Sequence, residues 1–296
     1  MAPAEIRPCR SALYLPASNE RAIAKARTLP CDAVILDLED AVAPEMKASA
    51  RAAAVAAFGA GGFGRRLRVL RVNGIDTEWG ADDLAAAVTL DIDAVIAPKV
   101  DGPADIARYD AALSDAAPAV QLWVMIETCL AVGHLQAIAD CATTTRLGGF
   151  VMGTNDLALE MRAAAMPGRA NMLPILTLSL AAARSRGLIA LDGVCNDFSD
   201  LERFRAEAEQ GLALGFDGKT LIHPAQVDPC NAVFSPSLEA INQARSISAA
   251  FALPENVGKG AIRLDGRMVE RLHLVEAERV LAVAGAVHRG NELHSA

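Results

Sequence analysis

The sequence predicts an α/β protein, a (β/α)8 or TIM barrel followed by a C-terminal helical arm or lid. Short apolar, β-branched runs alternate with amphipathic, Ala-rich segments as far as residue 225, a rhythm typical of βα units on a parallel sheet. Eight such runs can be counted, and roughly 220 residues for eight units suits a closed barrel. A doubly wound open sheet is the alternative. The barrel is favoured because no GxGxxG follows the first run and polar residues end many runs.

The expected elements can be placed in order along the chain. Strands are expected at residues 11–17, 33–39, 66–74, 94–100, 119–127, 149–156, 188–195 and 215–224. The first helix follows Ser18, and the second starts at Pro44 and ends at Gly59, since Pro is frequent at helix starts and Gly at helix ends. Helices are also expected at 238–252 and 268–284, separated by a Gly-containing extended piece.

The change of pattern after His223 predicts two domains. We expect a barrel that carries the site over residues 1–230 and a C-terminal arm or lid over residues 231–296. A tail with an irregular linker, beyond a closed barrel, is often a lid or an oligomer arm.

The composition excludes several classes of protein. With 296 residues, 52% of them hydrophobic, the chain can bury a large core, and its net charge of −8 argues against a nucleic-acid partner. No stretch approaches about 18 uninterrupted apolar residues, and the N-terminus lacks the layout of a signal peptide. We therefore expect a cytoplasmic protein without a membrane partner. The six cysteines form no CxxC pair, so we expect them to be small buried hydrophobes.

Most of the expected strands end in a polar residue, and in a barrel the site lies at the carboxyl ends of the strands. These residues are Arg71, Asn73, Lys99, Glu127, Asp156 and either Asp192 or Asn196. Glu127 and Asp156 suit Mg²⁺, which takes oxygen ligands and needs only one or two carboxylates. The alternative is that each caps a helix or pairs with a lysine. The turn at Gly153 can hold a carboxylate beside the metal through backbone N–H groups, or it is a plain βα turn.

Three further side chains have more than one interpretation. Arg71 can bind a carboxylate or stabilise an enolate oxygen, or it forms a buried ion pair with Glu39 or Asp40. Lys99 can form a Schiff base with a keto acid, although the surrounding acids would raise its pKa rather than lower it. His223 caps a helix or contacts a bound ligand.

Eight stretches occur in the order of one known family, from residue 10 to about residue 270. They are RSALYLPA, DAVILDLEDAVAP, RVNG, APKV, IETCLAV, GTNDLALEM, GFDGKTLIHPAQV and GAIRLDGRMVE. The chain thus resembles the citrate lyase β-subunit family, also called the CitE-like or HpcH/HpaI aldolase group, which includes malyl-CoA and citramalyl-CoA lyases. The resemblance implies a (β/α)8 barrel, a Mg²⁺ site and a homotrimer or hexamer. It implies reversible Claisen cleavage of a malyl-, citramalyl- or citryl-CoA type 3-hydroxyacyl-CoA into an acyl-CoA and a keto acid.

The resemblance assigns roles to individual residues. Glu127 and Asp156 match the metal ligands, and Arg71 matches the arginine on the substrate carbonyl and enolate. Glu39 and Asp40 match acids near the waters of the metal.

Three more residues are expected to take part through the resemblance. Arg10 and His223 are expected to contact CoA. Glu270, in DGRMVE, matches the acid of the C-terminal arm that reaches the site of a neighbouring subunit as the acid/base group. The family commonly has Asp at that position, one methylene shorter. Asp37, one pleat deeper than Glu39, is expected to be structural.

Two other functions remain open. One is a metal-dependent aldolase acting on free hydroxy-keto acids, which would share the metal and the arginine but need no CoA. The other is a non-catalytic family member acting as a structural or regulatory subunit. The altered DGRMVE motif favours that interpretation, while the intact Arg71, Glu127 and Asp156 oppose it.

Overall fold

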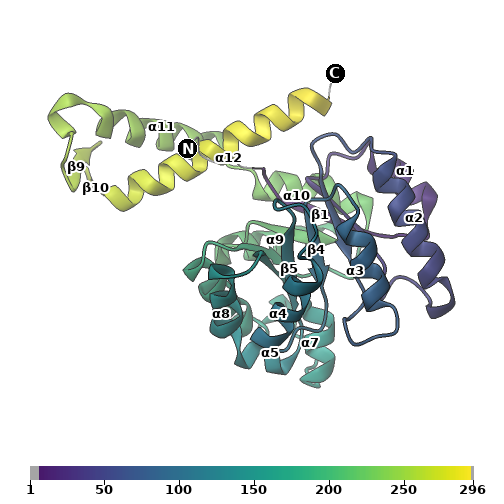
Figure 1. Cartoon of the computed structure of the whole chain (residues 1–296). Helices are drawn as coiled ribbons and strands as arrows, with labels where there is room; N and C mark the ends of the chain where they lie inside the picture. Colours follow the sequence, from purple (N-terminus) through teal and green to yellow (C-terminus); the bar gives the residue numbers. More distant parts are fainter. Residues whose placement is uncertain (1–6, 295–296) are drawn as a thin grey trace. The chain divides into compact units, whose positions relative to one another are not determined.

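Eight parallel strands form a closed barrel in the unit that spans residues 9–232 (Figure 1). The computed structural model describes residues 7–294. Each strand pairs with the next along the chain, and β8 returns to β1, which confirms the predicted fold. The strands are β1 (Ser11–Pro16), β2 (Ala33–Asp37), β3 (Leu67–Arg71), β4 (Ala94–Ala97), β5 (Gln121–Ile126), β6 (Leu147–Met152), β7 (Ile189–Asp192) and β8 (Gly218–Leu221).

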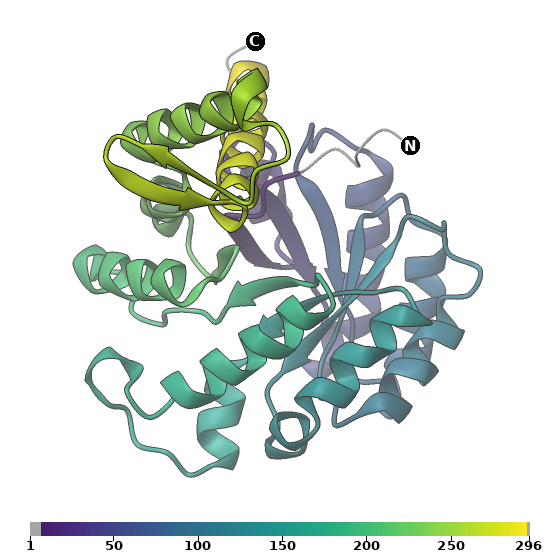
Figure 2. The same cartoon turned by 90° about the vertical axis from the view of Figure 1, so that its left-hand side faces the viewer.

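Helices follow the strands and lie outside them in both views of this unit (Figures 1 and 2). They are α1 (Glu20–Ala26), α2 (Lys47–Gly59), α3 (Gly80–Val88), α4 (Pro103–Ala112), α5 (Cys129–Gly133), α6 (Leu135–Asp140), α7 (Thr154–Glu160), α8 (Leu173–Ser185), α9 (Leu201–Leu214) and α10 (Val227–Phe234). Asn19 caps α1 with its side chain. Gly215 ends α9 in the left-handed conformation at φ 109°, so β8 starts later than the sequence pattern predicts.

The barrel interior is filled by apolar side chains from the strands. Ile35, Val69, Ile96, Trp123 and Val151 belong to one buried cluster, as expected when alternate strand residues point inward. A Cβ on Gly149 would lie 2.3 Å from Ile189 Cγ2 and 3.0 Å from the Trp123 ring, so the glycine makes room for the indole. Four cysteines are buried as expected, but Cys129 is exposed and Cys141 is half-buried.

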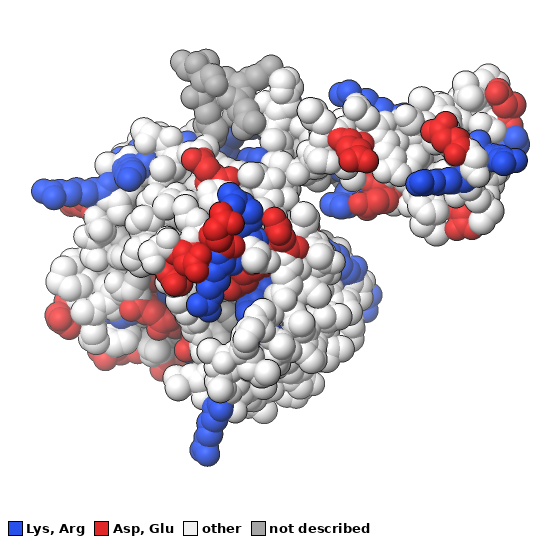
Figure 3. Space-filling view, turned by 180° about the vertical axis from the view of Figure 1, so that it is seen from behind, with Lys and Arg blue, Asp and Glu red and all other residues white. Residues whose placement is uncertain are grey.

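Ion pairs tie several elements of the barrel together beside β7 and β8. Lys219 Nζ lies 2.9 Å from Asp192 Oδ2 and 2.8 Å from Glu207 Oε1, and Arg169 Nη1 lies 2.8 Å from Asp192 Oδ1. Burial raises the pKa of Asp192, but the two cations outweigh this effect and hold that pKa below its ordinary value. Charged side chains of both signs also lie next to one another on the surface of this unit (Figure 3).

The C-terminal unit contains two helices and a β-hairpin. It consists of α11 (Leu238–Ala252), β9 (Ala261–Leu264), β10 (Arg267–Glu270) and α12 (Arg271–His294), and Figure 2 shows the hairpin beside α12. Its core contains Ile247, Phe251, Ile262 and Val269. The predicted helix 268–284 was wrong at its start, because residues 268–270 pair with β9. Asp265 and Gly266, at φ 47° and 78°, form the tight turn that hairpins favour.

No helix in residues 7–294 combines the length and apolarity needed to cross a membrane.

Replacing Asp192 by Asn should destabilise the barrel, because it leaves Lys219 and Arg169 with excess buried positive charge. We expect a loss of about 3 kcal/mol or more in the free energy of unfolding at pH 7, measured by urea titration. The pKa of Asp192 is depressed in the folded state, so its stabilisation is full above an unfolded pKa of about 3.9 and is lost as the pH falls through the folded value. The difference between the two proteins should therefore shrink below about pH 4.

Glu202→Gln is the matched control, because Glu202 forms an exposed ion pair with Arg205. It should change the free energy of unfolding by less than about 1 kcal/mol. Equal effects of Asp192→Asn and Glu202→Gln would contradict the importance of the buried cluster.

Candidate active site

A cavity of about 380 Å³ lies at the carboxyl ends of the barrel strands. Its walls contain Tyr14, Asp37, Asp40, Ala41, Arg71, Met125, Met152, Gly153, Thr154, Asn155, Asp156, Val194, Asn196, Thr220 and Ile222. These residues lie in or directly after seven of the eight strands, all except β4, and barrel enzymes place their sites at the carboxyl ends of the strands. We call this space the catalytic cavity.

Arg71 is fixed at the bottom of the catalytic cavity by Asp37. The two residues are partners in the register of β2 and β3, and Arg71 Nε and Nη2 each lie 2.6 Å from one Asp37 oxygen. This bidentate contact sets the plane of the guanidinium. Burial lowers the pKa of Arg71, but Asp37 more than compensates, and that pKa lies above its ordinary value.

The expected pairing of Arg71 with Glu39 and Asp40 is also present. Arg71 Nη1 lies 2.7 Å from Glu39 Oε2 and 3.3 Å from Asp40 Oδ2, and the Tyr14 ring lies 4.9 Å from the guanidinium carbon. Glu39 Oε2 accepts no hydrogen bond from the described residues despite this distance, so the contact is an ion pair without good N–H alignment. Burial raises the pKa of Glu39 to about 8, against the opposing effect of Arg71.

Asp37 was expected to be structural, but its position makes it the residue that orients Arg71. Sequence reasoning placed the partner of Arg71 among Glu39 and Asp40, which follow the strand. The sequence could have predicted the pair of Asp37 and Arg71, because each residue ends a strand and the two strands are neighbours in the barrel. Residues at equivalent heights on adjacent parallel strands lie side by side.

Glu127 and Asp156 lie close to the same ammonium group. Lys99 Nζ is 2.9 Å from Asp156 Oδ1 and 3.6 Å from Glu127 Oε1, and the Lys99 N–H donates to Glu127 Oε1 at 2.7 Å. Partial burial lowers the pKa of Lys99, but the hydrogen bond to Asp156 and the charge of Glu127 outweigh it and raise that pKa. A lysine held in its charged form is unsuited to Schiff-base chemistry, which needs the neutral amine.

The surroundings of Glu127 fit a divalent cation. Its Oε2 atom is buried and has no hydrogen-bond partner among the described residues, which leaves a carboxylate oxygen available as a ligand. A Cβ on Gly153 would lie 2.4 Å from Glu127 Cβ and 2.5 Å from Oε2, so only glycine allows this carboxylate its position. Burial raises the pKa of Glu127 to about 7, with Lys99 opposing.

Glu127 and Asp156 could supply only part of the coordination shell of a metal ion. Residues 7–294 contain no group of three or more His, Cys, Asp and Glu side chains arranged to hold a metal. Mg²⁺ is commonly bound by one or two carboxylates, with waters or substrate oxygens as the other ligands. Glu127 and Asp156 therefore suit Mg²⁺ better than Zn²⁺, which takes three or four protein ligands.

A buried polar network that sequence reasoning missed holds the end of β2. Lys47 Nζ donates to Leu38 O at 2.8 Å, Glu39 O at 2.7 Å and Asn73 Oδ1 at 2.7 Å. Asn73 Nδ2 donates in turn to Asp83 Oδ2 at 2.6 Å. Asn73, expected at the site, thus supports the Leu38–Glu39 backbone. Lys47 lies in an Ala-rich helix with no sequence signal for this role.

The remaining predicted site residues lie in different places. His223 accepts from the Ala225 N–H at 3.2 Å as the N-cap of a short 3₁₀ helix, Pro224–Gln226, and its ring stacks on Phe198 at 4.6 Å. The capping interpretation is confirmed, and its contact with CoA stays a prediction. Glu270 ends β10 in the C-terminal unit, where its N–H donates to His273 Nδ1 at 2.9 Å. Its catalytic role stays a prediction.

Arg10 does not belong to the catalytic cavity. It directly precedes β1, at the amino end of the strand, and its guanidinium is buried against Asp32 at 2.8 Å. The amino ends of barrel strands lie on the face opposite the site. The predicted contact between Arg10 and CoA does not fit this position, and the residue instead joins the starts of β1 and β2.

The model of the HpcH/HpaI aldolase/citrate lyase family matches residues 10–224. The chain belongs to this family. A (3S)-malyl-CoA thioesterase of Cereibacter sphaeroides is 48% identical over 95% of this chain and 96% of the relative. An L-malyl-CoA/β-methylmalyl-CoA lyase of the same species is 33% identical over 94% of this chain and 95% of the relative.

A solved structure of CitE from Mycobacterium tuberculosis, in complex with magnesium, acetoacetate and coenzyme A, is also similar. It is 29% identical, the match covers 95% of this chain and 100% of that chain, and the TM-score is 0.75. The family resemblance found in the motifs is therefore confirmed. The two relatives are named for reactions of malyl-CoA thioesters.

Replacing Asp37 by Asn should be far more damaging than replacing Asp40 by Asn. Asp37 is buried in its bidentate pair, so its neutralisation should lower the free energy of unfolding by about 3 kcal/mol or more. The Asp40 side chain is 61% exposed, so the matched change there should cost less than about 1 kcal/mol. Urea unfolding of both variants measures the difference, and equal losses would show that Asp37 is not the main support of Arg71.

Proposed function

We propose that this chain is a Mg²⁺-dependent enzyme that hydrolyses the thioester bond of a short 3-hydroxyacyl-CoA of the malyl-CoA class. The observation that carries the proposal is the grouping of the Glu127 and Asp156 carboxylates around Lys99, beside a cavity that Asp156 and Arg71 line. The similarity to a malyl-CoA thioesterase over 95% of this chain supports hydrolysis in particular.

Glu127 and Asp156 would hold Mg²⁺, which supplies a Lewis acid for the carboxylate and hydroxyl oxygens of the substrate. The same residues fix the hydroxy-acid half of the substrate at one side of the cavity. Lys99 would turn away from its present position between the two carboxylates. Among the described residues its Nζ atom pairs with these two acids, and its side chain is 44% exposed.

Arg71 would bind the thioester carbonyl. When water attacks that carbon, negative charge develops on the carbonyl oxygen, and a guanidinium already oriented by Asp37 stabilises it without rearranging. Glu39 and Asp40 would orient water at the mouth of the cavity. The bond to sulfur then breaks, and the products are the free hydroxy acid and CoA.

Glu270 is proposed as the proton-transferring carboxylate, supplied by the C-terminal arm of another copy in a homotrimer or hexamer. In hydrolysis it would take a proton from the attacking water. His223 is proposed to contact CoA. These two roles come from the family resemblance and from the motif in which each residue lies.

Carbon–carbon cleavage is the second candidate, because a malyl-CoA/β-methylmalyl-CoA lyase is 33% identical over 94% of this chain. The same residues would serve it. Arg71 would stabilise the enolate oxygen of the acyl-CoA, and Glu270 would protonate the acyl carbon. The two reactions differ in their last reactant. In hydrolysis water attacks the thioester carbon, whereas in cleavage a proton is added to the enolate of the acyl-CoA. An aldolase acting on free acids has less support, since both relatives are named for CoA thioesters.

The products of malyl-CoA with Mg²⁺ distinguish the two reactions. Hydrolysis releases malate and one equivalent of free thiol without glyoxylate, whereas cleavage releases glyoxylate and acetyl-CoA without free thiol. We expect free thiol, measured with a thiol reagent, in excess over glyoxylate, measured as its phenylhydrazone. EDTA and Glu127→Gln should each lower kcat/KM by about 100-fold or more, since either change removes the cation that orients the substrate.

Glyoxylate without thiol would overturn hydrolysis in favour of cleavage. Mg²⁺ binding without either product, across malyl-, citramalyl- and citryl-CoA, would favour a non-catalytic family member. Full activity after metal removal would overturn the metal mechanism.

Gly153→Ala should weaken Mg²⁺ binding by about tenfold or more, because the new methyl group displaces the Glu127 carboxylate. Gly153 has φ −94°, so alanine itself causes no backbone strain and the effect is a steric one on Glu127. Isothermal titration of Mg²⁺ measures the change. Gly133→Ala is the control, since nothing lies within 4 Å of a Cβ at that position. Equal affinities of the two variants would contradict Glu127 as a ligand.

A further inference from the structure

Tyr14, on β1, lies in the wall of the catalytic cavity. In the register of β1 and β2 it comes two residues before the position that pairs with Asp37. It therefore belongs to the layer of side chains below Asp37 and Arg71. The ring packs against the buried cluster of the barrel, and the Arg71 guanidinium carbon lies 4.9 Å from the ring centre.

The Tyr14 hydroxyl oxygen is buried without a hydrogen-bond partner among the described residues. Such an atom costs free energy, and native proteins keep few of them. Burial raises the pKa of the phenol against the opposing charge of Arg71, so the group keeps its proton at pH 7. A neutral phenol in this position can donate one hydrogen bond.

Two carboxylate oxygens near the phenol also lack a hydrogen-bond partner among residues 7–294. They are Glu39 Oε2 and Glu127 Oε2, and the charges of both residues act on Tyr14. An ionised carboxylate only accepts hydrogen bonds, and neither oxygen lies within hydrogen-bond distance of the phenol. Tyr14 is therefore the donor of this group, and the partner it lacks is an acceptor.

The second tyrosine of the chain is buried as well, but its hydroxyl has partners. Tyr109 accepts from the Ile75 N–H at 2.9 Å and donates to Pro98 O at 3.5 Å. Burial by itself thus does not leave a tyrosine hydroxyl of this barrel without a partner.

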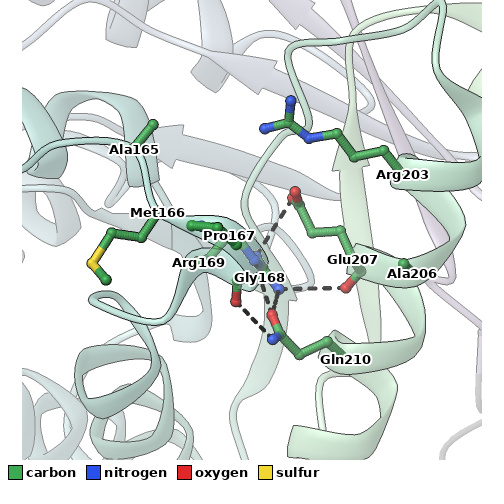
Figure 4. Close-up of a pocket in the computed structure, with 9 residues that line it drawn as sticks. All are labelled: Ala165, Met166, Pro167, Gly168, Arg169, Arg203, Ala206, Glu207 and Gln210. Atoms are coloured by element: carbon green, nitrogen blue, oxygen red, sulfur yellow. Dashed lines mark hydrogen bonds and ion pairs between the residues drawn. The ribbon is translucent and has the colours of Figure 1, made fainter.

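The cavity of about 460 Å³ beside α9 shows the same contrast (Figure 4). Its Arg169 donates to Gln210 Oε1 at 2.9 Å and lies 3.6 Å from Glu207 Oε1. None of the unpartnered buried atoms in residues 7–294 belongs to a residue that lines that cavity. The unpartnered donor of Tyr14 is instead at the catalytic cavity, where a ligand can complete its hydrogen bonding.

Arg71 also has a donor group that a substrate oxygen can use. Asp37 occupies Nε and Nη2, whereas Nη1 faces Glu39 without good alignment and lies 3.3 Å from Asp40. The Asp40 side chain is 61% exposed, so a substrate oxygen can replace this contact at little cost.

One oxygen atom can accept from both Arg71 and Tyr14. Each hydrogen bond spans about 2.8 Å, so two donors about 5.5 Å apart can share an acceptor between them. The 4.9 Å separation of the guanidinium carbon from the ring centre is compatible with such a bridge. A carbonyl oxygen has the two lone pairs that this arrangement requires.

We propose that the Tyr14 hydroxyl is a catalytic group that donates a hydrogen bond to the thioester carbonyl oxygen, together with Arg71. This inference rests on the proposed function for the placement of the thioester at Arg71. Tyr14→Phe is the informative variant, because it keeps the ring beside the guanidinium and removes only the hydroxyl.

The two donors act on the charge that develops in the reaction. When water adds to the thioester carbon, the electron pair of the C=O bond moves onto the oxygen, where Tyr14 and Arg71 stabilise it. The pair then returns, the C–S bond breaks, and the CoA sulfur leaves with the proton that the water loses. In carbon–carbon cleavage the same donors would hold the enolate oxygen, so Tyr14 has one role in both reactions.

Binding of acetyl-CoA and of CoA to the whole protein with Mg²⁺ tests the contact without turnover of malyl-CoA. Acetyl-CoA has the thioester carbonyl and CoA lacks it, so the ratio of their Kd values, from titration calorimetry, reports contacts with the acetyl group. Tyr14→Phe should lower the preference for acetyl-CoA about fivefold. Tyr109→Phe, the matched control, should leave the preference unchanged.

Turnover of malyl-CoA, followed by whichever product the wild type forms, tests the catalytic role. Tyr14→Phe should lower kcat about 100-fold and change KM by less than about fivefold. Its urea midpoint should not fall, because the hydroxyl has no partner to lose among the described residues. Tyr109→Phe should show the reverse, with a lower urea midpoint and kcat within about twofold of the wild type.

An unchanged preference for acetyl-CoA in Tyr14→Phe, or an unchanged kcat, would overturn the proposal. A loss of Mg²⁺ affinity as large as the loss of kcat would also overturn it, because Tyr14 would then act through Glu127. The malyl-CoA product assay tests the proposed function separately. The acetyl-CoA comparison needs no turnover, so the two proposals can fail independently.

Discussion

The buried pair of Arg71 and Asp37 is the interaction on which the catalytic cavity depends. Both residues end strands inside the barrel, and each would be costly to bury alone. Their bidentate contact holds the guanidinium in one plane, and Glu39, Asp40 and Tyr14 are arranged around it. The Arg71 guanidinium is therefore held in one orientation at the carboxyl ends of the strands. The acids around it are paired with this guanidinium, so they are less available to bind a metal ion.

The acids of the cavity fall into two groups with different partners. Asp37, Glu39 and Asp40 surround Arg71, whereas Glu127 and Asp156 surround Lys99. Under the proposed function, this separation would give two places of opposite charge, one for an oxygen that gains negative charge and one for a divalent cation. A thioester with a hydroxy acid at one end has groups for both places. The family to which the chain belongs is consistent with that chemistry.

The sequence was sufficient for the barrel and for its strand-end residues, and insufficient for several partners. Alternation of apolar runs and amphipathic helices is a local property, so the eight strands could be counted before their pairing was known. The β9–β10 hairpin was missed because its four-residue strands are too short to show a period, although Asp265 and Gly266 are a turn signal. Arg10 was expected to contact CoA because it belongs to a matched motif. The residue precedes β1, however, and so lies on the face of the barrel opposite the site.

The fold class, the family and the positions of Arg71, Glu127 and Asp156 at strand ends all follow from the sequence alone. The contacts of Asp37 with Arg71 and of Lys47 with the end of β2 become evident only in the folded structure. The reason is physical. Periodicity and motifs indicate whether a segment is a strand or a helix, but contacts between side chains 26 or 34 residues apart depend on strand register and helix placement. Those are settled only when the barrel closes.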